Sequence, residues 1–104
     1  MKIAHVTQIA HLNDTFRRGG FGVMVTKGVR ELGDAAGIMR AVREFNTFSE
    51  DNDPHGEHDF GTIMWLGEKL FWKIDYYDAK LEFGEYPLSQ KCRRVLTVML
   101  ANEY

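Results

Sequence analysis

The apolar residues in the first half of the chain recur with two different periods. Between residues 2 and 18 they fall at helical spacing, which predicts an amphipathic helix that ends at Gly19 and Gly20. The stripe consists of Ile3, Val6, Ala10, Asn13 and Phe16. In residues 21–26, Phe21, Val23 and Val25 alternate with Gly22, Met24 and Thr26, which predicts a strand ended by Lys27 and Gly28.

A second helix is predicted to begin at Asp34, whose side chain is well suited to cap it. Ile38, Val42 and Phe45 supply its apolar stripe. The helix cannot continue through residues 49–56, because the Asn-Asp-Pro sequence ending at Pro54 favours a turn.

Two β-rich runs, residues 62–66 and 69–77, predict a hairpin. They are separated by Gly67 and Glu68, and glycine at the first turn position indicates a two-residue type II′ loop. In the register that follows, Leu66 lies opposite Lys69 and Phe60 lies opposite Asp75.

Alternation then assigns the side chains of the hairpin to two faces. One face must belong to the core, since it carries Ile63, Trp65, Leu70, Trp72 and Ile74. The other face is amphipathic. The predicted register places His58 on this second face, opposite Tyr77 and diagonal to Asp75.

The last third of the chain is less clearly patterned. Residues 81–83 suit a short strand before a turn over residues 84–87. Ser89 can cap a final helix over residues 90–103, with a strand over residues 95–100 as the alternative. The sequence thus predicts one α+β domain over residues 1–104, in the order α-β-α-β-β-α, with an antiparallel sheet built around the aromatic hairpin.

Composition narrows the class of protein. A chain of 104 residues with 44% hydrophobic residues can bury a core without disulfides, and its single cysteine, Cys92, cannot form one within the chain. No apolar stretch approaches the ~20 residues of a membrane span, and the N-terminus lacks the apolar segment of a signal peptide. We therefore expect a cytoplasmic protein without a membrane partner.

Charge is unevenly distributed around the net value of -2. Residues 44–86 carry eleven Asp/Glu against three Lys/Arg, whereas both flanking segments have a basic excess. Such asymmetry can steer a charged partner. An ordinary mixed surface is nevertheless the favoured explanation, since no Lys/Arg run is longer than two.

The segment over residues 52–61 is the densest cluster of candidate ligands. Its carboxylates and imidazoles suit Zn²⁺, Mn²⁺ or Fe²⁺. The candidate ligands are Asp53, His55, Glu57, His58 and Asp59. Their spacing matches no defined metal site, and turn-forming residues dominate the segment, so a structural role is the favoured interpretation and no cofactor is expected.

The predicted register also offers acid–base chemistry. His58, oriented by Asp75, would act as a general base near neutral pH, and Tyr77 would donate a proton. No nucleophile, phosphate-binding loop or zinc-binding cysteine pair accompanies these three candidate catalytic residues.

Three blocks of sequence resemble an uncharacterised family of small bacterial proteins that contain a domain of unknown function. They are residues 12–17 (LNDTFR), residues 52–61 (NDPHGEHDFG) continuing to 71–78 (FWKIDYYD), and residues 94–101 with Glu103 and Tyr104. The family is often carried on plasmids and other mobile elements. The resemblance supplies no activity, but the mobile-element setting implies an accessory protein that binds a host defence component such as a CRISPR effector or a restriction enzyme.

The expected function is therefore a protein-interaction module, more in keeping with a binding protein than with an enzyme. Its predicted contact surface comprises Glu57, His58, Asp75, Tyr77 and Asp78. One alternative is a small hydrolase, metal-dependent or acid–base, built on His58, Glu57, Asp59 and Asp75. A nucleic-acid-binding protein using the Arg-bearing flanks is a further alternative, disfavoured because the aromatic hairpin lies in the acidic part of the chain. The sequence does not fix the oligomeric state.

Overall fold

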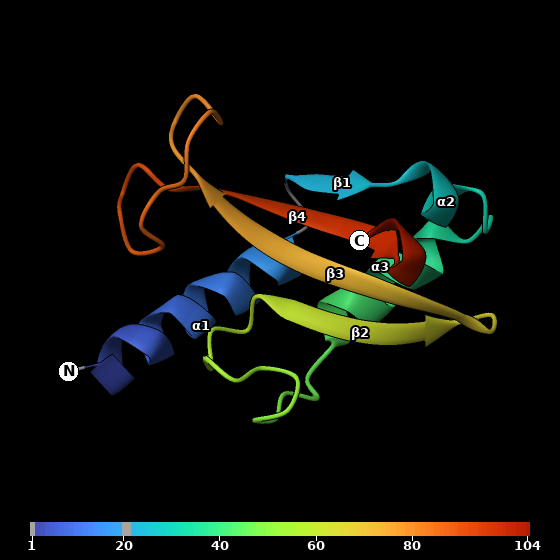
Figure 1. Cartoon of the computed structure of the whole chain (residues 1–104), viewed down its shortest axis with the longest axis horizontal. Helices are drawn as coiled ribbons and strands as arrows, with labels where there is room; N and C mark the ends of the chain where they lie inside the picture. Colours follow the sequence, from blue (N-terminus) through green and yellow to red (C-terminus); the bar gives the residue numbers. More distant parts are fainter. Residues whose placement is uncertain (1, 20–21) are drawn as a thin grey trace.

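The computed structural model describes residues 2–19 and 22–104 and shows a small α+β domain, as predicted (Figure 1). Its elements in chain order are α1 (Lys2–Gly19), β1 (Val23–Val25), α2 (Lys27–Arg30), α3 (Ala35–Glu44), β2 (Phe60–Trp65), β3 (Glu68–Tyr77), β4 (Arg93–Leu100) and a 3-10 turn, η1 (Ala101–Glu103). The predicted start of the first strand, at Phe21, lies outside the described residues.

The four strands form one sheet in the order β1-β4-β3-β2. β2, β3 and β4 are antiparallel neighbours, whereas β1 pairs in parallel with β4. The predicted antiparallel sheet is therefore mixed, because its short first strand returns beside the last one. Helix α3 begins as predicted, with the Asp34 carboxylate accepting a hydrogen bond from the backbone N–H of Gly37.

The predicted last helix is wrong, and the alternative strand is correct. β4 pairs with β3 over eight residues and with β1 over three. Leu96 and Val98 are fully buried on one face, while Val95 and Thr97 point to the other. Ser89 caps no helix, since its hydroxyl accepts a hydrogen bond from Lys91 within a turn. Residues 95–100 fit the periodicity of a helix as well as that of a strand, and pairing with β3 and β1 makes them a strand.

The predicted hairpin exists, but its turn lies one residue earlier. Leu66 and Gly67 form the turn with φ values of 53° and 82°, and Trp65 pairs with Glu68. Two positive φ values are typical of a type I′ turn, which follows the right-handed twist of the strands. Each residue of β2 therefore lies opposite a residue of β3 two positions earlier than predicted, as with Phe60, which faces Lys73 instead of Asp75. Because side chains alternate between the faces of a strand, a shift of two leaves every side chain between 60 and 77 on its predicted face. The predicted strand at 81–83 is a bend, beside an isolated bridge between Tyr77 and Gly84.

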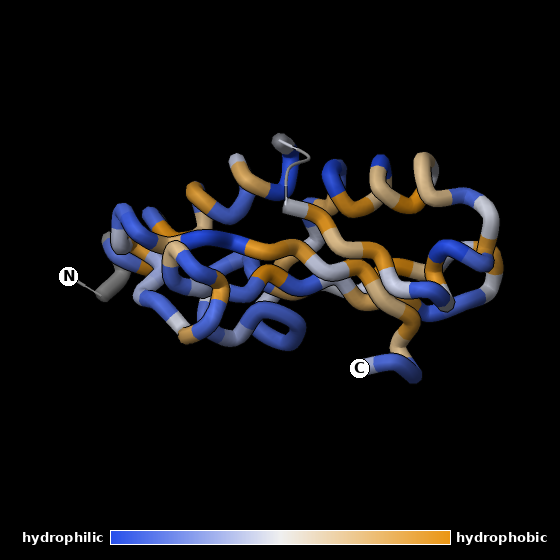
Figure 2. Tube along the Cα trace, turned by 90° about the horizontal axis from the view of Figure 1, so that it is seen from above, coloured by the Kyte–Doolittle hydropathy of each residue, from blue (hydrophilic) through white to orange (hydrophobic). Residues whose placement is uncertain are grey.

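Helices α1 and α3 cover one face of the sheet and leave the other uncovered, as the view from above shows (Figure 2). The core lies between the helices and this covered face. Its fully buried residues are Val29, Ile38, Val42, Leu70, Trp72, Leu96 and Val98. Trp65 closes one end of it, where its indole N–H donates to the Asp34 carboxylate at 3.1 Å. Within the described part of the chain, no helix combines the length and the apolar character needed to span a bilayer.

Candidate functional site

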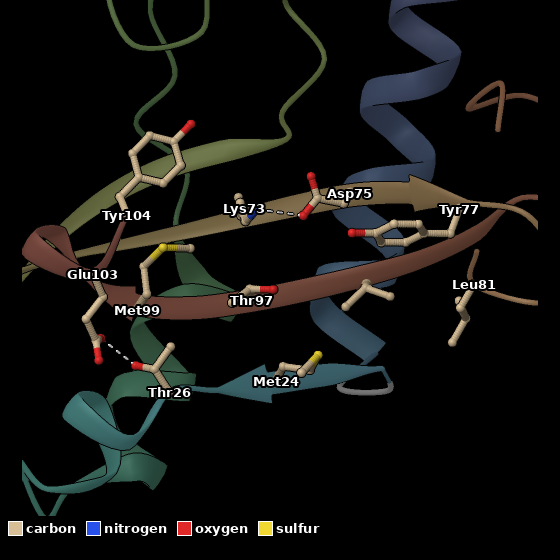
Figure 3. Close-up of a pocket in the computed structure, with 11 residues that line it drawn as sticks. Met24, Thr26, Lys73, Asp75, Tyr77, Leu81, Thr97, Met99, Glu103 and Tyr104 are labelled. Carbon is tan, nitrogen blue, oxygen red and sulfur yellow. Dashed lines mark hydrogen bonds and ion pairs between the residues drawn. The ribbon is translucent and has the colours of Figure 1, made fainter. Parts of the chain in front are cut away.

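The uncovered face of the sheet contains a shallow hollow of about 560 Å³ (Figure 3). Strands β1, β3 and β4, the turn after β3 and the C-terminal turn all contribute to its lining. Its lining includes Met24, Lys73, Tyr77, Val95, Thr97 and Met99, with Tyr104 at one end. We call the whole uncovered face of the sheet, which contains this hollow, the open face.

The open face leaves large apolar side chains accessible. Met24 and Tyr104 are 61% and 76% exposed, and Met64 on the neighbouring strand β2 is 64% exposed. Methionine side chains adapt readily to different surfaces, and exposed tyrosines are frequent anchors of protein interfaces. Exposed apolar side chains that border a hollow are typical of a site that another molecule covers.

The charges of the open face are largely compensated among themselves. Lys73 and Asp75, two positions apart on β3, form an ion pair at 3.0 Å (Figure 3). Hydrogen bonding to Asp75 raises the pKa of Lys73 against the opposing effect of burial. The pair therefore presents little net charge to a molecule that enters the hollow.

Glu103 fastens the C-terminal turn beside the hollow. Its carboxylate accepts hydrogen bonds from the hydroxyl of Thr26 at 2.6 Å and from the backbone N–H of Leu100 at 2.7 Å. These bonds, that of Thr26 above all, lower the pKa of Glu103. Thr26 also caps α2 by accepting from the backbone N–H of Val29. These bonds of Glu103, which we call the Glu103 clamp, thus join the C-terminal turn to the start of α2.

The clamp places Tyr104 in an aromatic cluster on the open face. Its ring lies 5.9 Å from that of Phe60 and 5.6 Å from that of Phe71, which contact each other at 5.0 Å. Lys69 lies 5.7 Å from the ring of Phe71. The aromatic rings extend the apolar surface from the hollow toward β2.

Helix α1, which lies on the covered face of the sheet, holds the acidic segment of residues 52–61 in place. Arg17 is completely buried, and its guanidinium donates to the carbonyls of Val42 and Phe45 at 2.7 and 2.8 Å and to Asp14 at 2.9 Å. Burial lowers the pKa of Arg17, while its bond to Asp14 opposes that change. The side chain therefore satisfies the carbonyls at the end of α3 and orients Asp14.

Asp14 in turn holds His58. Its two carboxylate oxygens each lie 3.0 Å from Nδ1 of the imidazole, which stacks on Phe48 with ring centres 3.8 Å apart. Asp53 accepts a hydrogen bond from the backbone N–H of His58 and lies 3.8 Å from its Nε2. His58 has a φ of 56°, a conformation that nonglycine residues seldom adopt and that this set of contacts stabilises.

A second network fixes Glu57 to the centre of the domain. Asn13, which is buried, donates to the carbonyl of Glu57 and to the hydroxyl of Tyr76, both at 2.9 Å. Tyr76 donates to the Glu57 carboxylate at 3.0 Å, and Arg94 donates to Asn13 at 2.6 Å. Burial raises the pKa of Tyr76, which keeps the hydroxyl protonated as a donor.

The five residues of the predicted contact surface divide between two sides of the sheet. Asp75 and Tyr77 line the hollow, and Asp78 organises the next turn by accepting from the backbone N–H groups of Lys80 and Glu82. Glu57 and His58 instead face residues of α1. The predicted placement of His58 beside Asp75 and Tyr77 is therefore wrong, because β2 starts only at Phe60 and the positive φ of His58 turns it away.

The candidate metal ligands also fail to converge. Asp53 is buried against His58, His55 is exposed, and Glu57 bonds with Tyr76. Burial raises the pKa of Asp59, and its backbone carbonyl accepts from Ile74. Over residues 2–19 and 22–104, no group of three or more His, Cys, Asp and Glu side chains has a geometry that could hold a metal ion.

The observed geometry makes His58 a structural linker. Its Nδ1 lies 3.0 Å from the Asp14 carboxylate, and its Nε2 lies 3.8 Å from that of Asp53. A general base needs a ring nitrogen aimed at the substrate proton. The predicted arrangement of His58, Asp75 and Tyr77 is absent, because the histidine lies on the far side of the sheet.

Sequence reasoning missed the residues that hold this segment in place. Asn13 and Arg17, one helical turn apart, are both fully buried on α1. The available signal was a polar residue in the apolar stripe of the first helix, at Asn13. A buried polar side chain must find hydrogen-bonding partners, and here these are Glu57, Tyr76 and Arg94.

Comparison with protein families gives a match over most of the chain. The model of a family described as "Protein of unknown function (DUF3768)" matches residues 25–103. This range includes the three long strands, α3 and the acidic segment, and α1 precedes it. Neither the curated proteins nor the solved structures give a match to the chain.

Proposed function

Since the chain belongs to the family described as protein of unknown function (DUF3768), we propose its function from geometry: a module that binds another protein through the open face of its sheet. The observation that carries the proposal is the hollow, with its exposed apolar side chains and its aromatic border. The opposite face is covered by helices, and its polar groups are used to hold the acidic segment.

The chemistry of the open face favours an apolar, weakly charged protein surface as the partner. Lys73 is paired with Asp75, and Glu103 is bonded to Thr26, so charged side chains at the hollow already have partners within the domain. A nucleic acid would require an excess of positive charge that tracks its phosphates. Apolar contact with Met24 and Tyr104 is the interaction that this surface offers best.

The resemblance to proteins of mobile elements suggests the class of partner. An element that enters a new host meets CRISPR effectors and restriction enzymes, and a small binding protein can inhibit these without chemistry of its own. We assign the partner to such a defence complex, with the open face as the inhibitory surface.

The test is a plasmid transformation assay in a host with an active CRISPR or restriction system. Expression of the wild-type chain should raise transformation of a targeted plasmid and leave an untargeted plasmid unchanged. Thr97→Lys places a second lysine in the hollow, opposite Lys73, and should lower the effect about tenfold or more. Thr15→Lys, an equal change on the exposed side of α1, should retain it.

A melting scan of both variants separates a binding defect from unfolding. Equal activity of the two variants would reject the open face as the inhibitory surface. Absence of any relief by the wild type against both classes of defence would reject the defence partner. A photo-crosslinking residue at Met24, compared with one at Leu66 in the hairpin turn, then tests contact directly, since only the former lies at the hollow.

A further inference from the structure

Strand β2 forms one edge of the sheet and has a strand partner on one side only, β3. It runs over six residues in unbroken register, from Phe60 opposite Lys73 to Trp65 opposite Glu68. The other edge strand, β1, has only three residues. The β2 edge is therefore the longer of the two unpaired edges.

The direction of the backbone groups of β2 follows from its turn. In a two-residue hairpin the residues that flank the turn exchange hydrogen bonds, so Trp65, Ile63 and Gly61 point their N–H and C=O groups toward β3. The bond from the N–H of Ile74 to the carbonyl of Asp59, at 2.8 Å, continues this pattern.

Phe60, Thr62 and Met64 consequently point their backbone groups outward. Among residues 2–19 and 22–104, these outward groups have no hydrogen-bond partner. They form a row of three donors and three acceptors along the edge.

This edge lacks the features by which proteins usually prevent edge pairing. β2 contains no charged residue, no proline and no bulge. Its outward side chains on the open face include Met64, which is 64% exposed. Lysine, proline, bulges and very short strands are the usual means of blocking an edge, and β2 has none of them.

We propose that a second copy of this chain pairs with the β2 edge. The two β2 strands would run antiparallel about a two-fold axis at Thr62, with Phe60 of each copy opposite Met64 of the other. In this register all the outward groups of Phe60, Thr62 and Met64 meet partners, giving about six hydrogen bonds between the copies. A register centred on Met64 would require pairing by Leu66, whose φ of 53° belongs to the turn.

The absence of charged residues from β2 favours a second copy of the chain as the molecule that pairs with this edge. A two-fold axis sets each residue against its own strand, so any charge near Thr62 would meet a like charge, and β2 carries none. The facing side chains suit one another: an aromatic ring beside a thioether on the open face, and Gly61 beside Ile63 on the covered face. The two open faces would then form one continuous surface.

The size of the contact predicts a reversible dimer. Six residues from each copy are fewer than the roughly 20–30 a side in a standard stable interface. We therefore expect the weight-average mass in sedimentation equilibrium to rise from the chain mass of 12.0 kDa toward twice that value as concentration increases. A mass that stays at one chain up to millimolar concentration would overturn the proposal.

Charge substitutions at the axis test the register. Thr62→Lys sets two lysines against each other and should abolish dimerisation, as should Thr62→Glu with two carboxylates. Neither touches the bonds to β3, because the backbone groups of Thr62 point outward. An equimolar mixture of the two variants should restore the dimer, since Lys then faces Glu.

Thr15→Lys is the matched control on α1 and should dimerise as the wild type does. Persistence of the dimer in Thr62→Lys, or failure of the mixture to dimerise while both variants melt as the wild type does, would overturn the Thr62-centred pairing. The outcome can be told apart from the open-face function, because Thr62 does not line the hollow and the mass measurement needs no other protein.

Discussion

At the scale of single residues, Arg17 is the side chain on which the arrangement of the acidic segment depends. We expect Arg17→Met to lower the free energy of unfolding by about 3–5 kcal/mol, because it leaves the carbonyls of Val42 and Phe45 buried without a donor and Asp14 without its cation. Urea unfolding followed by circular dichroism measures the change.

Arg18→Met is the matched control, since Arg18 is exposed on the same helical turn and its loss should change stability by less than about 0.5 kcal/mol. Similar losses in the two variants would show that the buried bonds of Arg17 contribute no special stability. A second, specific readout is the Phe48–His58 contact, whose ring-current shifts should disappear in Arg17→Met alone.

The same residues show where sequence reasoning ends at this scale. The cluster of His58 with neighbouring carboxylates was visible in the sequence, and so was the polar residue Asn13 within an apolar stripe. Their partners were not, because Asp14 lies 44 positions from His58 and Asn13 lies 63 positions from Tyr76. Local periodicity carries no information on contacts over such separations. It also cannot predict the positive φ of His58, which other parts of the chain impose.

At the scale of elements, the β2–β3 hairpin has a turn that is poorly matched to its sequence. Leu66 adopts a φ of 53°, which a leucine side chain disfavours, while it is 72% exposed and contributes little to the core. We expect Leu66→Asn to raise the free energy of unfolding by about 0.5–1 kcal/mol, since Asn-Gly is the preferred type I′ pair.

Met24→Asn serves as the control in urea unfolding at low protein concentration. Met24 is similarly exposed, but it lies within a strand, where asparagine gives no such advantage and should be neutral or destabilising. Equal effects of the two substitutions would mean that polarity, rather than turn geometry, accounts for the gain.

The elements also differ in how far their sequences determine them. α1, α3 and the two faces of the hairpin follow from period and capping, because each has a long pattern of one kind. The turn was displaced by one residue because a glycine suits both the first position of a type II′ turn and the second position of a type I′ turn. β4 was predicted as a helix because residues 95–100 are apolar except for Thr97, a pattern that fits a helix as well as a strand. Its two strand neighbours, β3 and β1, are distant in sequence and decide its structure.

At the scale of the whole molecule, the two faces of the sheet have separate tasks. The covered face carries the core and the polar networks that hold the acidic segment. The open face carries apolar side chains that stay accessible. This division explains why the residues of the predicted contact surface separate: Glu57 and His58 belong to the support, whereas Asp75 and Tyr77 belong to the accessible surface.

Because the core and the polar networks of the covered face include residues of α1, we expect this helix to be part of the folding unit, although the family match starts after it. A chain of residues 22–104, which lacks α1, would leave Trp72 without the guanidinium of Arg17 that lies 4.8 Å from its ring. It would also leave Glu57 and Tyr76 without the amide of Asn13. We expect this chain to lose its cooperative urea transition and to show red-shifted tryptophan fluorescence, because an unsupported covered face exposes the core.

Addition of a peptide of residues 1–19 should restore both signals at concentrations near its dissociation constant, and the same peptide with Arg17→Met should not. A cooperative transition in residues 22–104 alone would mean that the sheet and α3 suffice for folding. Helix α1 would then serve to position the acidic segment, and hydrogen exchange at Glu57 and His58 would be the property that its removal changes.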